Sequence, residues 1–328
     1  MVESIRIGIV GYGNLGRGVE MALARSPDMQ LVGIFSRRNP ASIKPLGANV
    51  PVHGMDTIGQ FRDAIDVLIL CGGSKSDLPE QGPALAAQFN TVDSFDTHNK
   101  IPEYFAAVDE AARPAQRTAI ISVGWDPGLF SLNRLFGEAI LPAGETYTFW
   151  GKGLSQGHSD AIRRVPGVRG GVQYTVPSTA AMERVRSGSL PQLSTREKHV
   201  RECYVVLEEG ADAKAVEQTI VTMPDYFADY DTTVHFISEA DLHRDHSAMS
   251  HGGFVIRSGQ TGNNSKQIIE YSLKLDSNPE FTSSVLVAYA RAAYRLHRSG
   301  EHGARTVLDI APGLLSSKSA AQLRKELL

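Results

Sequence analysis

A strand, a glycine-rich turn and a helix follow one another near the start of the chain, and this order constrains the fold most strongly. Residues 5–10 are apolar and mostly β-branched, as expected for a strand buried on both faces. The hexapeptide Gly11-Tyr12-Gly13-Asn14-Leu15-Gly16 and a helical pattern over 17–25 come next. Its glycines permit a tight turn, close approach of a pyrophosphate and packing of helix on strand. We therefore predict a dinucleotide site that includes Gly11, Tyr12, Gly13, Asn14 and Leu15.

The next predicted strand indicates which dinucleotide is bound. It covers residues 30–35 and ends in Ser36-Arg37-Arg38. An NAD site normally places an Asp or Glu at this tip, where it accepts hydrogen bonds from the ribose hydroxyls. A hydroxyl and two guanidinium groups suit a 2′-phosphate better, so we predict NADP. The alternative is that Arg37 and Arg38 are solvated arginines on a loop.

Strands and helices continue to alternate as far as residue 124. Strands are predicted at 66–71, 91–95 and 118–123, and helices at 79–88 and 102–113. Such alternation indicates an α/β, Rossmann-type domain with a parallel sheet, here residues 1–124. Ligands of such sheets bind beyond the carboxyl ends of the strands. We therefore expect two loop segments beside the cofactor: Gly73-Ser74-Lys75-Ser76 and Trp125-Asp126-Pro127-Gly128.

The pattern changes in residues 125–280, which predict an α+β domain with a mainly antiparallel sheet. Strands are expected at 146–150, 171–176, 199–207, 232–237 and 253–257, and helices at 130–140, 179–187 and 213–222. A long helical pattern then covers 281–299. We expect the C-terminal segment, about 281–328, to pack back on the nucleotide domain.

Composition excludes several classes of protein. The chain of 328 residues has a net charge of −3, so no basic surplus indicates nucleic acid binding. It shows neither a leader-like segment nor an apolar run of transmembrane length, and we expect a soluble, cytoplasmic protein without membrane contact. Cys71 and Cys203 are too few for a cysteine-based zinc site. A metal site at His243, His246 and His251 is the alternative reading of a histidine cluster, but the spacing matches no ligand motif, so we predict no metal.

Two aspartates follow predicted neighbouring strands. Asp96 comes after the strand that ends at Phe95, and Asp126 after the strand that ends at Val123. A carboxylate pair near a hydride acceptor suits an ammonium substrate, because it attracts the cation and can accept its proton. The alternative is that each aspartate caps a turn or a helix. We favour catalytic roles for Asp96 and Asp126.

Polar groups in the second domain predict a pocket for a small ligand. The segment from Trp150 to Asp160 is rich in glycine and polar residues, and we expect a loop that wraps a ligand with backbone amides and an aromatic wall. Arg201 lies within a predicted strand, where a substrate carboxylate is one candidate partner. His251, next to Gly252 and Gly253, could donate a hydrogen bond to a carboxylate.

Taken together, these motifs resemble those of the meso-diaminopimelate dehydrogenase family. The resemblance covers essentially the whole chain and is most specific in the segment that begins at Trp150. The segments that carry it are Gly11–Gly16, Phe35–Arg38, Gly124–Gly128, Phe149–Asp160, Thr222–Tyr226, His251–Gly253 and Leu275–Pro279.

The resemblance implies an NADP-dependent oxidoreductase that acts on CH–NH2 groups. It implies reversible deamination of meso-2,6-diaminopimelate at its D-configured carbon, giving L-2-amino-6-oxopimelate and ammonia, by a homodimer in lysine biosynthesis. Residues 125–280 then form the substrate-binding and dimerisation domain. The implied substrate-binding residues are Asp96, Asp126, Trp150, Gln156, Gly157, Thr175, Arg201, His251 and Asn278. Gly72 and Phe95 depart from the family pattern, which has a bulkier residue and a tyrosine there.

Two other functions are compatible with these features. One is another NADP-dependent amino-acid dehydrogenase or reductase of the same two-domain architecture. The other is a non-catalytic nucleotide sensor. The aspartate pair and the polar segment at Trp150 argue against a sensor, which needs no second polar pocket.

Overall fold

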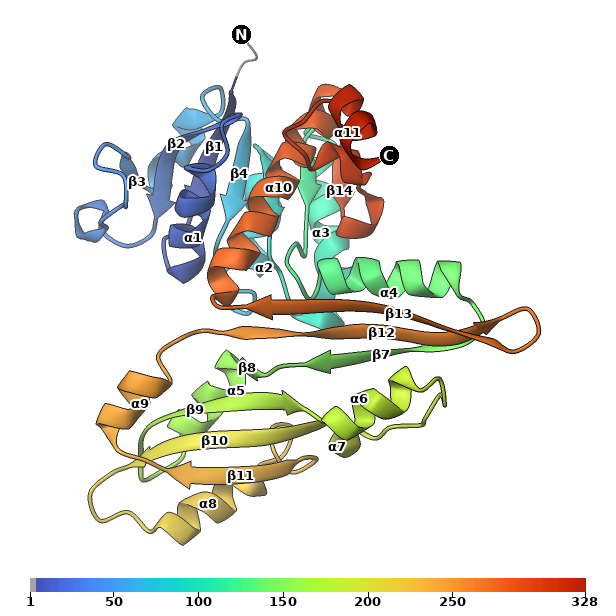
Figure 1. Ribbon diagram of the computed structural model, residues 1–328. Helices are drawn as coiled ribbons and strands as arrows, with labels where there is room; N and C mark the ends of the chain where they lie inside the picture. The colour runs from blue at the N-terminus through green and yellow to red at the C-terminus, as the bar shows by residue number, and fades with distance from the viewer. Residues whose placement is uncertain (1–3) are drawn as a thin grey trace. The chain divides into compact units, whose positions relative to one another are not determined.

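The computed structural model describes residues 4–328, and these form two compact units (Figure 1). The first unit contains the chain up to Leu132 together with Pro279–Leu328. The second unit is Asn133–Asn278.

The first unit is built on a parallel sheet, which confirms the predicted Rossmann-type fold. Within residues 4–328 this sheet has seven strands in the order β14-β6-β5-β4-β1-β2-β3, and every neighbouring pair is parallel. The strands are β1 (Ile5–Val10), β2 (Met29–Ser36), β3 (Val52–Gly54), β4 (Val67–Leu70), β5 (Asn90–Asp93), β6 (Thr118–Ile120) and β14 (Gly303–Arg305).

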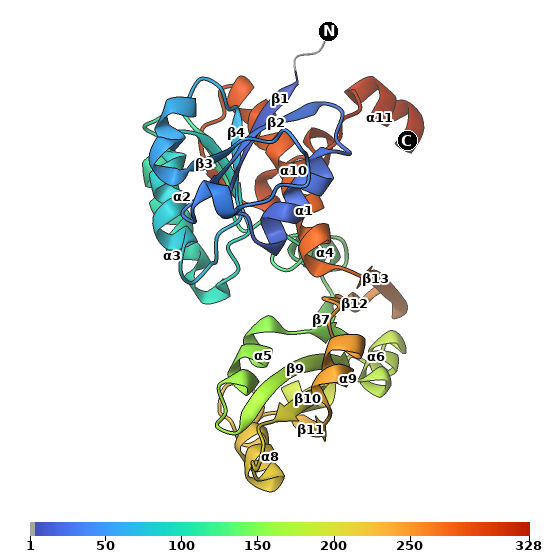
Figure 2. The same ribbon diagram turned by 90° about the vertical axis from the view of Figure 1, so that its left-hand side faces the viewer.

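Helices cover both faces of this sheet (Figure 2). They are α1 (Asn14–Leu23) and α10 (Asn278–Arg298) on one face, and α2 (Leu78–Ala86) and α3 (Ile101–Ala112) on the other. Strand β4 shows why both faces are covered, because Val67 and Ile69 pack toward α1 and α10 while Leu68 and Leu70 pack toward α2 and α3. A strand that is apolar at every position requires cover on both sides.

The C-terminal segment belongs structurally to the first unit. Strand β14 pairs with β6, and the Ser283 hydroxyl of α10 donates a hydrogen bond of 2.8 Å to the Leu15 carbonyl. A Cβ at Gly18 of α1 would lie 2.5 Å from the Ser283 Oγ, so a glycine is required for this close helix contact. The chain ends in α11 (Ala320–Leu327).

The second unit contains two sheets. Within Asn133–Asn278 one has the order β11-β10-β9-β8 and the other β13-β12-β7. All neighbouring strands are antiparallel except β10 and β11, so the predicted mainly antiparallel character is confirmed. The strands are β7 (Gly144–Trp150), β8 (Gly153–Leu154), β9 (Val168–Pro177), β10 (His199–Leu207), β11 (Asp231–Phe236), β12 (His251–Thr261) and β13 (Ser265–Leu275).

Five helices lie wholly within the residues described for the second unit, and a sixth, α4 (Leu129–Ile140), crosses its first boundary. The five are α5 (Gln156–Arg163), α6 (Thr179–Arg186), α7 (Thr195–Lys198), α8 (Ala213–Val221) and α9 (Glu239–Asp245). Helices α5 and α8 pack on the inner face of β9 and β10, whereas α6 packs on β7 and β12.

One expectation about the second unit was wrong, and one strand was not predicted. The segment from Trp150 to Asp160 is not a continuous loop, since it contains β8 and the start of α5. Gly151 lies between β7 and β8 with a φ of 110°, Gly153 lies in β8, and Gly157 lies in the first turn of α5. The long strand β13 was also missed, because ten of its residues are exposed or only half-buried and give little hydrophobic signal. No helix within residues 4–328 is long and apolar enough to cross a membrane.

Candidate active site

A pocket of about 280 Å³ lies where β1, β2 and β4 end. It contains six of the residues predicted to bind the cofactor: Gly11, Tyr12, Gly13, Ser36, Arg37 and Arg38. Asn14 and Leu15 follow directly as the first residues of α1. The pocket therefore joins the helix start to the basic tip of β2.

The glycines of the turn and of the start of α1 are subject to different steric constraints. Gly11 has a φ of 89°, and a Cβ there would lie 3.3 Å from the Cys71 backbone. A Cβ at Gly16 would approach the Gly11 carbonyl oxygen to 2.2 Å, so the helix could not pack this closely on the turn. A Cβ at Gly13 would meet nothing within 4 Å, and no side chain caps the start of α1 at this residue. The start of α1 at Gly13 therefore has room for a phosphate, the group that the N-terminus of a helix favours.

The basic tip of β2 is held by side chains and backbone of the first unit. The Arg38 guanidinium donates to the Tyr12 carbonyl, and the Arg38 amide donates to the Ser36 Oγ at 3.1 Å. Arg37 forms an ion pair with Asp77, whose carboxylate also accepts the Gly73 amide at 2.9 Å. The Gly73 amide and Arg37 hold the pKa of Asp77 below its usual value.

Asp77 was missed by the sequence analysis. It lies at the start of α2, where an aspartate is ordinarily assigned to capping. Its position also bears on Gly72, because a Cβ at Gly72 would lie 2.7 Å from the Asp77 Cβ. A bulkier residue at position 72 would require Asp77 to move.

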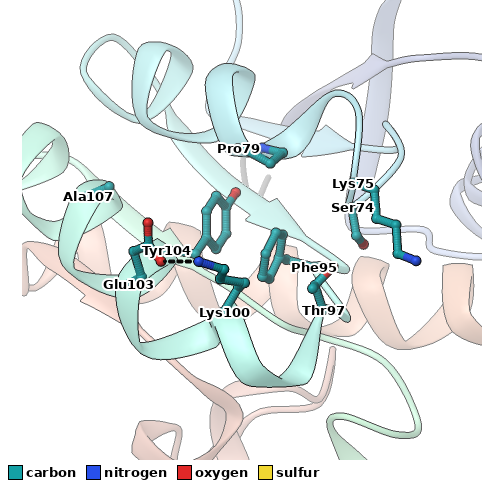
Figure 3. A pocket seen from close by; sticks show the side chains of 9 residues that line it. All are labelled: Ser74, Lys75, Pro79, Phe95, Thr97, Lys100, Glu103, Tyr104 and Ala107. Carbon is teal, nitrogen blue, oxygen red and sulfur yellow. Dashed lines mark hydrogen bonds and ion pairs between the residues drawn. The ribbon is translucent and has the colours of Figure 1, made fainter. Parts of the chain in front are cut away.

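The loop after β4 contacts a second pocket, of about 390 Å³ (Figure 3). Ser74 and Lys75 line this pocket rather than the first one. The Ser74 hydroxyl also accepts the Asp96 amide at 3.0 Å, which joins the loop after β4 to the loop after β5. Phe95 stacks on Tyr104 with ring centroids 4.1 Å apart, as the two neighbouring rings in Figure 3 show. Ser76 is exposed beside this loop.

Asp96 and Asp126 follow strands that are neighbours in the sheet. Strands β5 and β6 pair in parallel, so the loops that carry the two aspartates leave the same edge. Asp96 is exposed, and Asp126 is half-buried. Asp126 lies in the tight turn Trp125–Gly128, in which a Cβ at Gly128 would lie 1.8 Å from the Gly124 carbonyl oxygen. The prediction that both aspartates lie beyond the carboxyl ends of adjacent parallel strands is confirmed.

In the second unit, the central feature is a buried arginine. Arg201 on β10 is 6% exposed, and it pairs in register with Thr175 on β9, to whose hydroxyl it donates a hydrogen bond. Its guanidinium lies over the Tyr230 ring, 3.8 Å from the centroid. Within residues 4–328 its Nε has no hydrogen-bond partner, and no acidic side chain forms an ion pair with it. Burial lowers the pKa of Arg201, yet a guanidinium remains charged, so this site can accept an anion.

Other polar side chains surround Arg201 on the same face of the sheet. Gln173 is completely buried, and its Oε1 has no partner among residues 4–328. Strand pairing also places Gly153 beside Thr175, and the His251 ring lies where a Cβ of Gly153 would stand, 2.4 Å away. The His251 Nδ1 accepts the Gly252 amide at 2.8 Å. Strand register therefore places Thr175 beside Arg201, and the His251 ring packs against Gly153, the register neighbour of Thr175 on β8.

Trp150 is held by a histidine that the sequence analysis missed. The Trp150 amide donates to the His199 Nε2 at 2.8 Å, and the two rings stack with centroids 5.4 Å apart. Burial, with the Arg201 charge nearby, lowers the pKa of His199 to about 4. His199 is therefore a neutral acceptor at neutral pH. Its position two residues before Arg201 on a strand was the available signal, because alternate residues share a face.

The remaining predicted residues lie at starts of helices. Gln156 and Gly157 open α5, and a Cβ at Gly157 would meet nothing within 4 Å. In the same turn, burial lowers the pKa of His158 to about 4. Asn278 begins α10, and its amide donates to the Met249 carbonyl at 2.9 Å.

The other histidines considered for a metal have different surroundings. His246 packs on Tyr204 with ring centroids 4.1 Å apart, and its Nδ1 lies 3.1 Å from the Tyr174 hydroxyl. Within residues 4–328, no group of three or more His, Cys, Asp or Glu side chains is arranged to hold a metal ion.

Comparisons with known proteins agree with this geometry. Residues 124–277 match the family model described as the diaminopimelic acid dehydrogenase C-terminal domain. The chain is 66% identical to a meso-diaminopimelate D-dehydrogenase from Lysinibacillus sphaericus, with 100% of both chains covered.

Two solved structures are also similar. A C. glutamicum DAP dehydrogenase in complex with DAP is 47% identical, has a TM-score of 0.91 and matches over 100% of both chains. An engineered D-amino acid dehydrogenase bound to NADP+ is 46% identical, with a TM-score of 0.85 and coverage of 99% of this chain and 100% of that one.

Proposed function

The chain belongs to the meso-diaminopimelate D-dehydrogenase family, and we propose that it catalyses the reversible, NADP-dependent oxidative deamination of meso-2,6-diaminopimelate. The products are L-2-amino-6-oxopimelate and ammonia. The observation that carries the substrate assignment is the buried Arg201 guanidinium, which has no acidic partner among residues 4–328. A dicarboxylic diamino acid supplies the carboxylate that such a group requires.

The cofactor assignment rests on the first unit. The uncapped start of α1 at Gly13 fits a pyrophosphate, and Ser36, Arg37 and Arg38 fit a 2′-phosphate. Bound NADP+ supplies the hydride acceptor for the reaction. We propose that the loop residues Gly73–Ser76 and Trp125–Gly128 border the bound cofactor.

Asp96 and Asp126 are proposed to act on the reacting amino group. Their carboxylates attract the ammonium, and one of them accepts its proton, so that the nitrogen lone pair assists loss of hydride from the D-configured carbon. The resulting imine adds water and releases ammonia. Overall, one substrate, one NADP+ and one water give the oxo acid, ammonium, NADPH and one proton.

The second unit is proposed to hold the other end of the substrate. Thr175, Arg201 and His251 bind the distal carboxylate, and Asn278 helps to fix the distal amino-acid centre. Trp150 forms a wall of the pocket, while Gln156 and Gly157 provide polar contacts from the first turn of α5. Binding at both ends allows only one of the two amino-acid centres to react.

We assign residues 1–124, with about 281–328, to dinucleotide binding and residues 125–280 to substrate binding and dimerisation. Exposed apolar side chains in the second unit support a homodimer: Leu135, Phe136 and Ile140 on α4, and Ile268 and Ile269 on β13. Exposed apolar side chains favour burial against another protein surface. By family membership we place the reaction in the cytoplasm, in lysine biosynthesis.

The test is to follow NADPH appearance at 340 nm when the purified protein is given each diaminopimelate isomer. We expect turnover of the meso isomer with NADP and little with the LL isomer, which lacks a D-configured carbon. NAD serves as the cofactor control. NADP binding without turnover of any isomer would leave the fold intact and refute the proposed reaction.

A further inference from the structure

Asp93 is a buried carboxylate to which the sequence analysis gave no role. It is the last residue of β5 and is 1% exposed. Asp96 follows it by three residues on the same loop. Burial raises the pKa of Asp93 to about 6.

The Asp93 carboxylate accepts hydrogen bonds from three different segments. Its Oδ1 accepts the Phe95 amide at 2.9 Å and the Ser122 amide at 3.1 Å. Its Oδ2 accepts the Tyr104 hydroxyl at 2.7 Å. One oxygen atom therefore binds both the loop after β5 and the segment after β6.

Each of these two bonds fixes a segment that carries a proposed catalytic aspartate. Phe95 immediately precedes Asp96, and the Phe95 ring is held by stacking on Tyr104. Ser122 precedes the turn that contains Asp126, and its φ of 57° lies in the left-handed region, which is unfavourable for serine. A second bond, from the Val123 amide to the Asp93 carbonyl at 2.8 Å, holds the same segment.

We propose that Asp93 is a positioning residue for the reaction, because its carboxylate joins the Asp96 loop to the Asp126 segment and sets the two carboxylates relative to each other. This inference rests on the proposed function, in which both aspartates act on one amino group. Asp93 touches neither substrate nor cofactor in this scheme. Its effect is on geometry, and small errors in the placement of catalytic groups reduce turnover strongly.

Substitutions at Asp93 separate the two bonds. In Asp93→Asn the Oδ1 acceptor remains, and the new amide can donate to the Tyr104 hydroxyl. In Asp93→Ser the shorter hydroxyl can still accept the Phe95 amide, as in a serine turn, but it cannot reach the Ser122 amide. Asp93→Ala removes both bonds. Tyr104→Phe is the matched control, since it removes the third bond and leaves both amides held.

The experiment measures kcat with meso-diaminopimelate, the Kd for NADP and the thermal unfolding of each variant. We expect kcat close to wild type in Asp93→Asn and Tyr104→Phe. In Asp93→Ser we expect a fall on the order of 10- to 100-fold, with a much smaller change in the Kd for NADP. With substrate deuterated at the D-configured carbon, the isotope effect on kcat should rise in Asp93→Ser, because the hydride step becomes slower.

The outcomes distinguish this inference from the proposed function. An active wild type with an equally active Asp93→Ser variant would refute the positioning role alone. A loss of kcat in Asp93→Asn as large as in Asp93→Ser would also refute it, because the acceptor geometry is kept. A folded wild type that turns over no diaminopimelate would refute both. Asp93→Ser carries the test even where Asp93→Ala does not fold.

Discussion

Arg37 in the first unit and Arg201 in the second unit differ in how far their side chains are buried. Arg37 in the first unit has a side chain that is 66% exposed, and it lines the pocket at the ends of β1, β2 and β4. Arg201 in the second unit is 6% exposed and lies among a threonine hydroxyl, a tyrosine ring and a buried glutamine. An exposed arginine is partly screened by water and can be replaced at modest cost. A buried one leaves an unsatisfied charge whenever its ligand is wrong.

This contrast leads us to expect that the first unit determines the affinity for the cofactor and that the second unit determines which substrate is selected. In the proposed function, the cofactor is held by many groups, including backbone at the start of α1, whereas the distal end of the substrate is held by a few side chains. We therefore expect substitutions in the two regions to change different kinetic constants, and the predictions below test this from the largest effect to the smallest.

The largest effect is expected for Asp126, which is proposed to act on the reacting amino group of the substrate. Asp126→Asn should lower kcat by about 10²- to 10⁴-fold, because the amide cannot accept the ammonium proton. The Kd for NADP should change much less, since the glycine turn and the basic tip remain. Steady-state kinetics and a direct NADP titration measure the two effects. Unchanged turnover would remove Asp126 from the mechanism.

A smaller effect, confined to the substrate, is expected at Arg201. Arg201→Met should lower kcat/KM for meso-diaminopimelate by about 10- to 100-fold, as expected for loss of a charged hydrogen bond. The Kd for NADP should stay the same. Arg196→Met is the matched control, because Arg196 is half-exposed and pairs with Asp231 on the same sheet. Equal losses in the two variants would mean that Arg201 does not bind the substrate.

In the first unit, substitution of Arg37 should change the binding of the cofactor rather than that of the substrate. Arg37→Glu should weaken NADP binding by about tenfold or more and leave NAD binding unchanged, since a carboxylate repels the 2′-phosphate. Arg25→Glu makes the same charge change at an exposed site beyond the end of α1 and serves as the control. Titrations with both cofactors measure the effect. If NAD and NADP binding weaken equally, Arg37 does not contact the 2′-phosphate.

The smallest effect concerns stability against pH. The pKa of His199 is lowered to about 4 in the folded protein, whereas an unfolded histidine titrates near 6.5. The unfolded state therefore binds the proton more tightly, and the contribution of His199 to stability is lost as pH falls from about 6.5 toward 4. Between pH 7.5 and 5.5 the expected loss is about 1 kcal/mol.

His199→Gln should remove this part of the pH dependence, because glutamine can accept the Trp150 amide without titrating. Denaturant unfolding of both proteins at the two pH values measures it. Parallel stability profiles would show that His199 is not buried as a neutral acceptor.

The two regions also differ in how far sequence alone predicts them. The cofactor pocket was predictable because Gly11–Gly16 and Ser36–Arg38 are short contiguous segments whose order specifies their geometry. In the proposed substrate region, local patterns indicated Arg201 and His251, whereas Thr175 was predicted only through family resemblance, because it meets Arg201 through strand register. Helix α5 was missed because Gly157 in its first turn and Gly153 shortly before it weaken the helical pattern of the sequence. Asp77 and Gln173 gave no local signal of a role in the site, and the only signal for His199 was its position two residues before Arg201 on a predicted strand.

The most direct test of the account uses meso-diaminopimelate deuterated at one α-carbon at a time. The central claim is that both ends of the substrate are held, so that only the D-configured carbon delivers its hydrogen. We predict a primary isotope effect, with deuterium transferred to the reduced cofactor, only when the D-configured carbon carries the label. Transfer of deuterium from the L-configured carbon would contradict the claim.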